Sequence, residues 1–302
     1  MQTAWRYGSV SLLLIGCAAQ ALTRLPNASS GNRTWSAPAA LKEPTAQLQF
    51  GQAPPEQPIT IASPRPTLQV GERLQYHARW MGIPVGEGSV EVKEIVTLND
   101  RQAFHIVGEA HSNRWLSRFY PLKDIVHSYV DVEALHPLRF EKSQREGHYR
   151  SEEVVTFDHT AQIATYESLI NRAIKEHLGE AIKQIPIPVH IQDPLSVFYA
   201  LRLRPLEVGT SLNVDVYSDE KSYRMEVKVL DTRRLELRRR GVFDVITLEP
   251  IATFKGLLVE RGRVVVYLTA DEWRIPLAIY IWTPWGLVTG VIERASLQPI
   301  RP

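Results

Sequence analysis

The chain has 302 residues, of which 44% are hydrophobic and 23% charged, and its formal net charge is +2. This length allows one large domain or two small ones, and the composition is that of an ordinary globular protein. The near-neutral charge gives no indication of a nucleic-acid partner. Because the sequence holds one cysteine, an internal disulfide is excluded, and the fold must depend on its core.

Residues 1–16 have the parts of a secretory signal peptide. Arg6 and the amino terminus supply positive charge, and an apolar run over residues 10–15 leads to small residues. This run is far shorter than the roughly 20 residues that span a bilayer. Leu14-Ile15-Gly16-Cys17 reads as a lipobox, so we predict cleavage before Cys17 and its acylation, palmitate included. Secretion without lipid and retention in the cytosol are the alternatives.

Ala18 follows the cysteine, where inner-membrane lipoproteins of Gram-negative bacteria commonly have Asp. By that analogy, the predicted location is the cell envelope, lipid-anchored at the outer membrane and facing the periplasm. Residues 17–68 are rich in proline and polar residues without helical or strand periodicity, which predicts a disordered tether. Its proline content favours an extended chain, with a reach on the order of 100 Å.

From residue 69 to about 298 the pattern changes to short stretches that alternate apolar and polar residues. Leu74, Tyr76, Ala78 and Trp80 show the two-residue period of a half-buried strand. The turn at 82–86 separates this strand from one that begins near Gly88, and a third contains Phe104 and Ile106. Further strands are predicted at 125–132, 138–144, 149–157, 163–166, 211–217, 223–230, 234–239, 244–248, 264–268, 277–283 and 287–293. Many short strands separated by turns predict a mainly β domain with one large antiparallel, meandering sheet.

One helix is predicted over Pro194–Arg204. Asp193 suits the N-cap, Pro194 suits the first helical position, and apolar residues follow at helical spacing until Pro205. Its apolar stripe contains Phe198 and would pack on the sheet. Residues 169–185 have helical propensity but lie between strands, and a helix and a long hairpin both remain open for them.

Several of these stretches together resemble the DUF3108 family, exported bacterial proteins of unknown function. They are Gly71–Tyr76, Trp80–Gly86, Phe119–Asp124, Ser128–Asp131, Leu135–Lys142 with Glu146-Gly147, Gln192–Ser196 with Tyr199–Arg202, Gly241–Asp244, and Asp271–Pro276. Their order and spacing carry the resemblance, which covers about residues 70–297. The resemblance implies a sheet curved into a half-barrel around a central helix, and it implies no catalytic residues. The 169–185 stretch departs from the family, which has a shorter connection there.

The sequence shows no catalytic or metal-binding signature. The histidines lack the spacing of metal ligands, and there is neither a nucleophile elbow nor a phosphate loop. Glu152-Glu153, Asp219-Glu220 and Asp271-Glu272 are adjacent pairs, which would face opposite sides of a strand. We therefore expect no cofactor and no metal.

Two surface features remain. Arg233-Arg234 and Arg238-Arg239-Arg240 form a basic stretch that either meets anionic headgroups or polysaccharide or is simply solvated. Loop aromatics and the helix phenylalanine are candidate ligand or rim contacts, with core packing as the alternative. These residues are Trp115, Phe119, Tyr120, Phe198, Trp282 and Trp285.

These features together favour a non-enzymatic lipoprotein of the bacterial cell envelope. Its curved sheet would bind an apolar or envelope-derived ligand, and its partners would be the membrane, through the lipid anchor, and a lipid or envelope component, but no nucleic acid. The alternative is a periplasmic carrier or receptor for lipids or lipoproteins. An envelope hydrolase is the third reading, since serines and histidines are plentiful.

Overall fold

The structure is a computed structural model that describes residues 48–50, 59–65, 67–169, 182–238, 240–254, 257–258, 263–283 and 286–297. The predicted signal peptide, Cys17 and Trp285 lie outside the described residues. The fold is mainly β, as the sequence predicts, and the sixteen described strands belong to one sheet. In the described part of the chain, no helix is both long and apolar enough to cross a membrane.

The strands follow one another along the chain almost without interruption. They are β1 (Leu48–Phe50), β2 (Glu72–Trp80), β3 (Ile83–Leu98), β4 (Arg101–Ser112), β5 (Leu122–Asp131), β6 (Pro137–Glu146), β7 (Tyr149–Asp158), β8 (Ile163–Ser168), β9 (Ile182–Pro186), β10 (Ser211–Ser218), β11 (Lys221–Leu237), β12 (Gly241–Phe254), β13 (Leu257–Leu258), β14 (Arg263–Thr269), β15 (Pro276–Thr283) and β16 (Gly286–Leu297). A 3₁₀ turn, η1 (Leu116–Arg118), lies between β4 and β5, and the helix α3 spans Ser196–Arg202.

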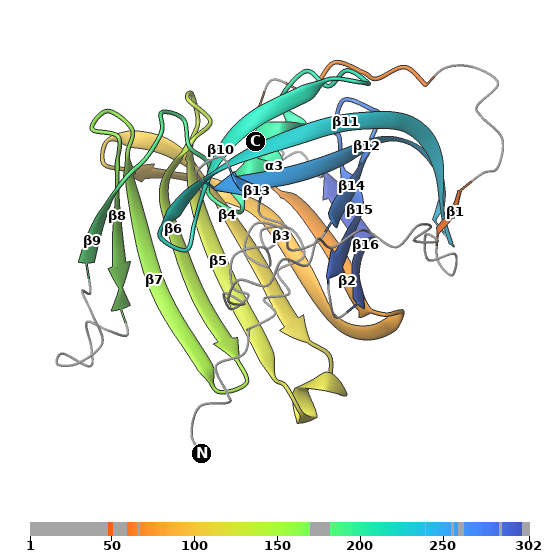
Figure 1. Cartoon of the computed structure of the whole chain (residues 1–302), viewed down its shortest axis with the longest axis horizontal. Helices are drawn as coiled ribbons and strands as arrows, with labels where there is room; N and C mark the ends of the chain where they lie inside the picture. Colours follow the sequence, from red (N-terminus) through yellow and green to blue (C-terminus); the bar gives the residue numbers. More distant parts are fainter. Residues whose placement is uncertain are drawn as a thin grey trace.

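The sheet is antiparallel, and its spatial order is β1-β11-β12-β14-β15-β16-β2-β3-β4-β5-β6-β7-β8-β9, with β10 beside β11 and β13 beside β12. The chain therefore closes β16 against β2, which joins its two halves. Figure 1 shows the resulting curvature: β11 and β12 arch over α3, while β3 to β9 form the other side of the molecule. The half-barrel around a helix that the family resemblance implies is therefore the observed arrangement.

Alternation determines which face of each strand is buried. In β2, Leu74, Tyr76 and Ala78 are buried while His77 on the other face is exposed. Strands β14 and β15 are instead buried on both faces, and their sequences read as nearly continuous apolar runs. Such runs are typical of strands with covered faces.

Strand β11 differs from the strands that the sequence predicts in this region. The two strands predicted at 223–230 and 234–239 form one strand, interrupted by a bulge between Val229 and Asp231. A bulge adds one residue, so the alternation continues with the opposite parity. Met225 and Val227 therefore point to one face, and Leu235 and Leu237 point to the other.

The region between β8 and β10 contains two further differences. The helix begins two residues later and ends two residues earlier than the predicted Pro194–Arg204. Residues 182–186 form β9 on β8, whereas 170–181 lie outside the described residues, so the choice between helix and hairpin stays open for most of 169–185. Residues of the predicted tether also contact the domain, since the Ala62 amide donates to Ala270 and β1 pairs with β11.

Candidate functional site

Helix α3 leaves a narrow groove between itself and the strands β11, β12 and β14. The groove is lined by apolar side chains, among them Phe198 and Leu201 from the helix, Met225 from β11, Leu248 from β12 and Leu268 from β14. Its free volume is about 40 Å³. The groove is much smaller than a cavity of about 150 Å³ that binds benzene, so it suits a short hydrocarbon segment rather than a ring.

The candidate aromatic residues do not form one site. Phe198 lines the groove, as expected for a ligand contact. Trp282 is half-buried, with its ring stacked on Tyr280 at 5.8 Å and the Arg263 guanidinium 5.5 Å from its centre. Tyr120 is half-buried, and its hydroxyl lies 3.4 Å from a carboxylate oxygen of Glu146.

Trp115 and Phe119 are the most exposed of the candidates. They flank the turn η1, with 57% and 76% of their surface exposed, and their rings meet edge to face at 6.0 Å. The β6–β7 turn lies beside this connection, because the Gly147 amide donates to the carbonyl of Pro121. One end of the sheet thus presents two aromatic side chains to solvent.

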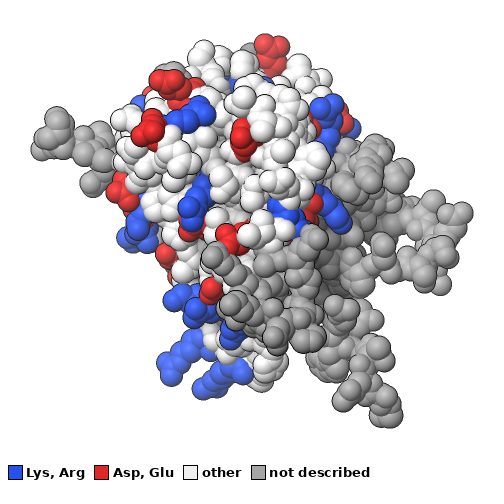
Figure 2. All heavy atoms as spheres, turned by 90° about the vertical axis from the view of Figure 1, so that its left-hand side faces the viewer, with Lys and Arg blue, Asp and Glu red and all other residues white. Residues whose placement is uncertain are grey.

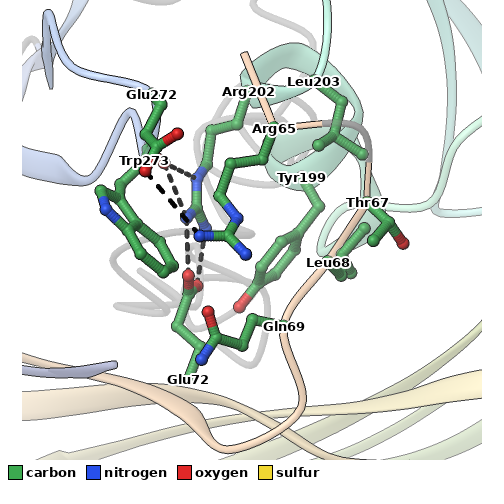
Figure 3. A pocket seen from close by; sticks show the side chains of 10 residues that line it. All are labelled: Arg65, Thr67, Leu68, Gln69, Glu72, Tyr199, Arg202, Leu203, Glu272 and Trp273. Atoms are coloured by element: carbon green, nitrogen blue, oxygen red, sulfur yellow. Dashed lines mark hydrogen bonds and ion pairs between the residues drawn. The ribbon is translucent and has the colours of Figure 1, made fainter. Parts of the chain in front are cut away.

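A buried ion pair joins α3 to the sheet. Arg202 donates two hydrogen bonds of 2.7 Å to the two oxygens of Glu72 on β2, and two more to the Trp273 carbonyl at 3.2 and 3.0 Å. Figure 3 shows the guanidinium reaching from the helix to the carboxylate, with Tyr199 beside it. Burial disfavours the charged guanidinium, but the hydrogen bonds and charge of Glu72 outweigh it and raise the pKa of Arg202. The neighbouring cavity of about 20 Å³ has room for little more than a water molecule, so this pair positions the helix.

Asp193 connects the start of α3 to the sheet on the same side. Its Oδ1 accepts the amides of Leu195 and Ser196, both at 2.7 Å, while its Oδ2 accepts the hydroxyl of Ser128 on β5 at 2.5 Å. The predicted capping role is thus confirmed in its chemistry, although Leu195 is the residue that directly precedes the helix. Complete burial raises the pKa of Asp193 to about 6, despite these hydrogen bonds.

A pair of carboxyl groups is buried at the other end of β5 and β6. Asp124 and Glu146 are 0% and 1% exposed, and the side-chain amide of Gln144 lies 3.4 and 3.3 Å from them. Burial, reinforced by Glu146, raises the pKa of Asp124 to about 7. Burial and Glu146 likewise raise the pKa of Tyr120 to about 12. The Asp124 carboxyl can therefore hold a proton near neutral pH.

Histidines distant in sequence meet in two places. His105 and His127 are 3.0 Å apart on β4 and β5, and the ring of His136 stacks on that of His159 at 3.6 Å and lies 3.3 Å from His190. Burial and the neighbouring His159 lower the pKa of His136 to about 4, so its ring is neutral. Among the described residues, no group of three His, Cys, Asp or Glu side chains is placed to hold a metal ion. None of the described histidines hydrogen-bonds to a serine.

Sequence reasoning missed the ion pair, the carboxyl pair and the histidine contacts. Glu72 and Arg202 are 130 positions apart, and no local pattern links them. Asp124 and Glu146 follow from strand pairing, since Asp124 lies opposite Gln144 and Leu122 opposite Glu146. The sequence signal for the carboxyl pair was a polar residue at a position where the alternation of its strand points inward. This signal could be used only once the pairing register of the strands was known.

These features define a curved antiparallel sheet with one internal helix. The sequence profile of the family described as "Protein of unknown function (DUF3108)" matches residues 75–300. The chain therefore belongs to the DUF3108 family. No curated protein matches the sequence.

Solved structures support the fold. A β-barrel-like protein of the DUF1849 domain family from Brucella abortus superimposes with a TM-score of 0.52 and 8% identity, covering 77% of this chain and 99% of that chain. A predicted lipoprotein from Parabacteroides distasonis covers 80% of this chain and all of its own, with 10% identity and a TM-score of 0.32. A predicted exported protein with a YmcC-like fold from Bacteroides fragilis covers 79% of this chain, with 10% identity and a TM-score of 0.30. Only the first is similar enough to bear on the fold.

Proposed function

We propose that this protein is a non-enzymatic binding protein of the bacterial cell envelope, and that the groove under Phe198 holds an apolar segment of an envelope-derived ligand. The observation that carries the proposal is the uniformly apolar lining of the groove between α3 and the arch of β11 and β12. Burial of hydrocarbon contributes about 0.8 kcal/mol per methylene. A short acyl segment fits the apolar chemistry of this lining.

A fluorescent fatty acid such as cis-parinaric acid tests the groove. The purified protein should bind it saturably, and Phe198→Glu should weaken binding at least tenfold, because it places a carboxylate in the apolar lining. Val208→Glu is the matched control, since Val208 is 51% exposed and lies outside the groove. The absence of saturable binding, or equal losses in both variants, would refute the groove as a ligand site.

The proposed location rests on the amino-terminal sequence. A signal peptide at 1–16, a lipid on Cys17 and a tether behind it would place the domain in the periplasm, attached to the outer membrane. Mass spectrometry of the mature amino terminus tests this proposal, and Cys17→Ser should move the protein from the membrane to the soluble fraction. An unmodified Cys17 in membrane-associated protein would contradict it.

Contact of the folded domain with a membrane surface is a second candidate role. The exposed rings of Trp115 and Phe119 favour it, together with exposed arginines at 114 and 118 in the β4–β5 connection and at 145 and 150 in the strand ends that flank the β6–β7 turn. On the face in Figure 2, Lys and Arg gather at the lower end, whereas both signs mix above. Aromatic rings suit the interface, and arginine suits anionic headgroups.

Vesicle co-sedimentation tests this contact. With Cys17→Ser as the background, the protein should bind phosphatidylglycerol-containing vesicles, and Trp115→Ser with Phe119→Ser should abolish most of that binding. Ile182→Ser with Val242→Ser removes two apolar side chains that are exposed elsewhere and serves as the control. If the control pair loses as much binding, this end of the sheet is not the contact.

A further inference from the structure

A larger cavity, of about 280 Å³, opens on the face of the sheet opposite to the groove. Arg79 and His77 of β2 line one side, and Arg238 and Arg240 of the β11–β12 turn line the other. Strand β16 adds Val291 between them. Segments that are about 160 positions apart in the sequence thus bring three arginines to one cavity.

Strand register separates this cavity from the groove. His77 lies opposite Val291, and Val291 lies opposite Ala278, so these side chains share one face. Val266, which lines the groove, lies opposite Ile279. Ile279 lies opposite Gly290, and Gly290 lies opposite Ala78, so this second set shares the other face of the sheet. The two cavities therefore have different linings, and neither depends on the other for its contacts.

Most of the described arginines of the sheet form an ion pair with a carboxylate, and the three arginines of the cavity differ in this respect. Arg73, Arg234 and Arg263, for example, each pair with a carboxylate. In the described part of the chain, no ion pair includes Arg79, Arg238 or Arg240. His77 of the cavity lies 3.0 Å from a carboxylate oxygen of Glu293 and 3.8 Å from one of Glu87. Three like charges repel one another unless an anion compensates them.

We propose that this cavity binds the phosphate group of a phosphate-bearing ligand. Guanidinium groups match phosphate oxygens with paired hydrogen bonds, and such charge-assisted bonds are about twice as strong as neutral ones. Leu237, Val291 and Ile292 add apolar surface beside the arginines. The chemistry that fits is a phosphate ester with hydrocarbon close to the phosphate. The volume accommodates a headgroup and lies just below the usual range of about 300–1,000 Å³ for small-molecule sites.

A phospholipid headgroup and a water-soluble phosphate ester share this chemistry, and two probes distinguish them. The purified protein is titrated by calorimetry with inorganic phosphate and, separately, with dihexanoyl phosphatidic acid below its micelle concentration. Binding of both with similar affinity identifies a site for soluble phosphates. Binding of the phosphatidic acid at least tenfold more tightly identifies a lipid headgroup whose glycerol and first methylenes contact Leu237 and Val291.

Two double variants with the same change in net charge provide the decisive comparison. Arg238→Gln with Arg240→Gln should weaken binding of either probe about 100-fold, about tenfold per arginine removed. Arg224→Gln with Arg234→Gln removes two exposed arginines outside the cavity and should change affinity less than threefold. Absence of binding by both probes, or equal losses in the two double variants, would overturn the proposal. Phe198→Glu should leave phosphate binding intact, so failure of the groove and failure of this cavity are distinguishable.

Discussion

Replacement of Arg202 by methionine should cost about 3–5 kcal/mol of unfolding free energy. The side chains of Arg202 and its partner Glu72 are 9% and 3% exposed, so the substitution leaves a carboxylate buried without its cation. Four hydrogen bonds are lost, two to Glu72 and two to the Trp273 carbonyl. Since domains are typically stable by only about 5–15 kcal/mol, the loss would be a large part of the total.

Urea unfolding followed by circular dichroism measures this loss as a lower midpoint with an unchanged slope. Arg234→Met is the control, because the pair of Arg234 with Asp244 is exposed and should contribute no more than about 1 kcal/mol. The double variant Glu72→Leu with Arg202→Met removes both charges and should be more stable than Arg202→Met alone. The reasoning fails if Arg202→Met costs no more than the control, or if the double variant is the less stable of the two.

Three further predictions concern Asp124, Asp193 and Gly86. The raised pKa of Asp124 means that the folded state binds the proton more tightly than the unfolded state, so the stability from this group is full below about pH 4 and is lost as pH rises through about 7. Asp124→Asn should flatten that dependence and stabilise the protein at pH 8 by at most about 4 kcal/mol, at about 1.4 kcal/mol per pKa unit. The urea midpoints of both proteins are measured from pH 4 to 8. If the midpoint of the variant changes with pH as much as that of the unmodified protein, the prediction is wrong. Asp193→Ala should cost about 2–3 kcal/mol, from the lost cap and the unpaired Ser128 hydroxyl, whereas Asp193→Asn retains an acceptor and should cost less in the same urea assay. Gly86→Ala would bring a Cβ against the carbonyl oxygen of His111 across the β3–β4 pair, so the melting temperature should fall by several degrees, and an unchanged melting temperature would contradict this close approach.

The strand pattern of the sheet could be predicted because most strands have one covered face. Alternation at Leu74, Tyr76 and Ala78 leads directly to β2, and similar patterns give β5 to β8 within a few residues. Strand β11 was divided in two because its bulge reverses the alternation after Val229. A local pattern cannot distinguish such a reversal from a turn, since both interrupt the period of two.

The candidate site was less predictable, because its parts come from distant strands. Phe198 could be placed on the apolar stripe of a helix, and it does line the groove. Arg79 could not be linked to Arg238 and Arg240, because their meeting depends on the closure of β16 against β2 and on the arch of β11 and β12. Sequence could identify the basic stretch but not what lies opposite it.

The bulge in β11 explains how one strand contributes to two cavities. Before it, Met225 and Val227 face α3 and line the groove; after it, Leu237 faces the other side and lines the arginine cavity. Without the extra residue, Leu235 and Leu237 would share a face with Met225, and the outer face of the arch would lose two side chains that are 0% and 2% exposed. The arch can therefore be buried on both faces while each face keeps its own lining. This arrangement allows a hydrocarbon segment and a phosphate group to be bound on opposite faces of the same strand.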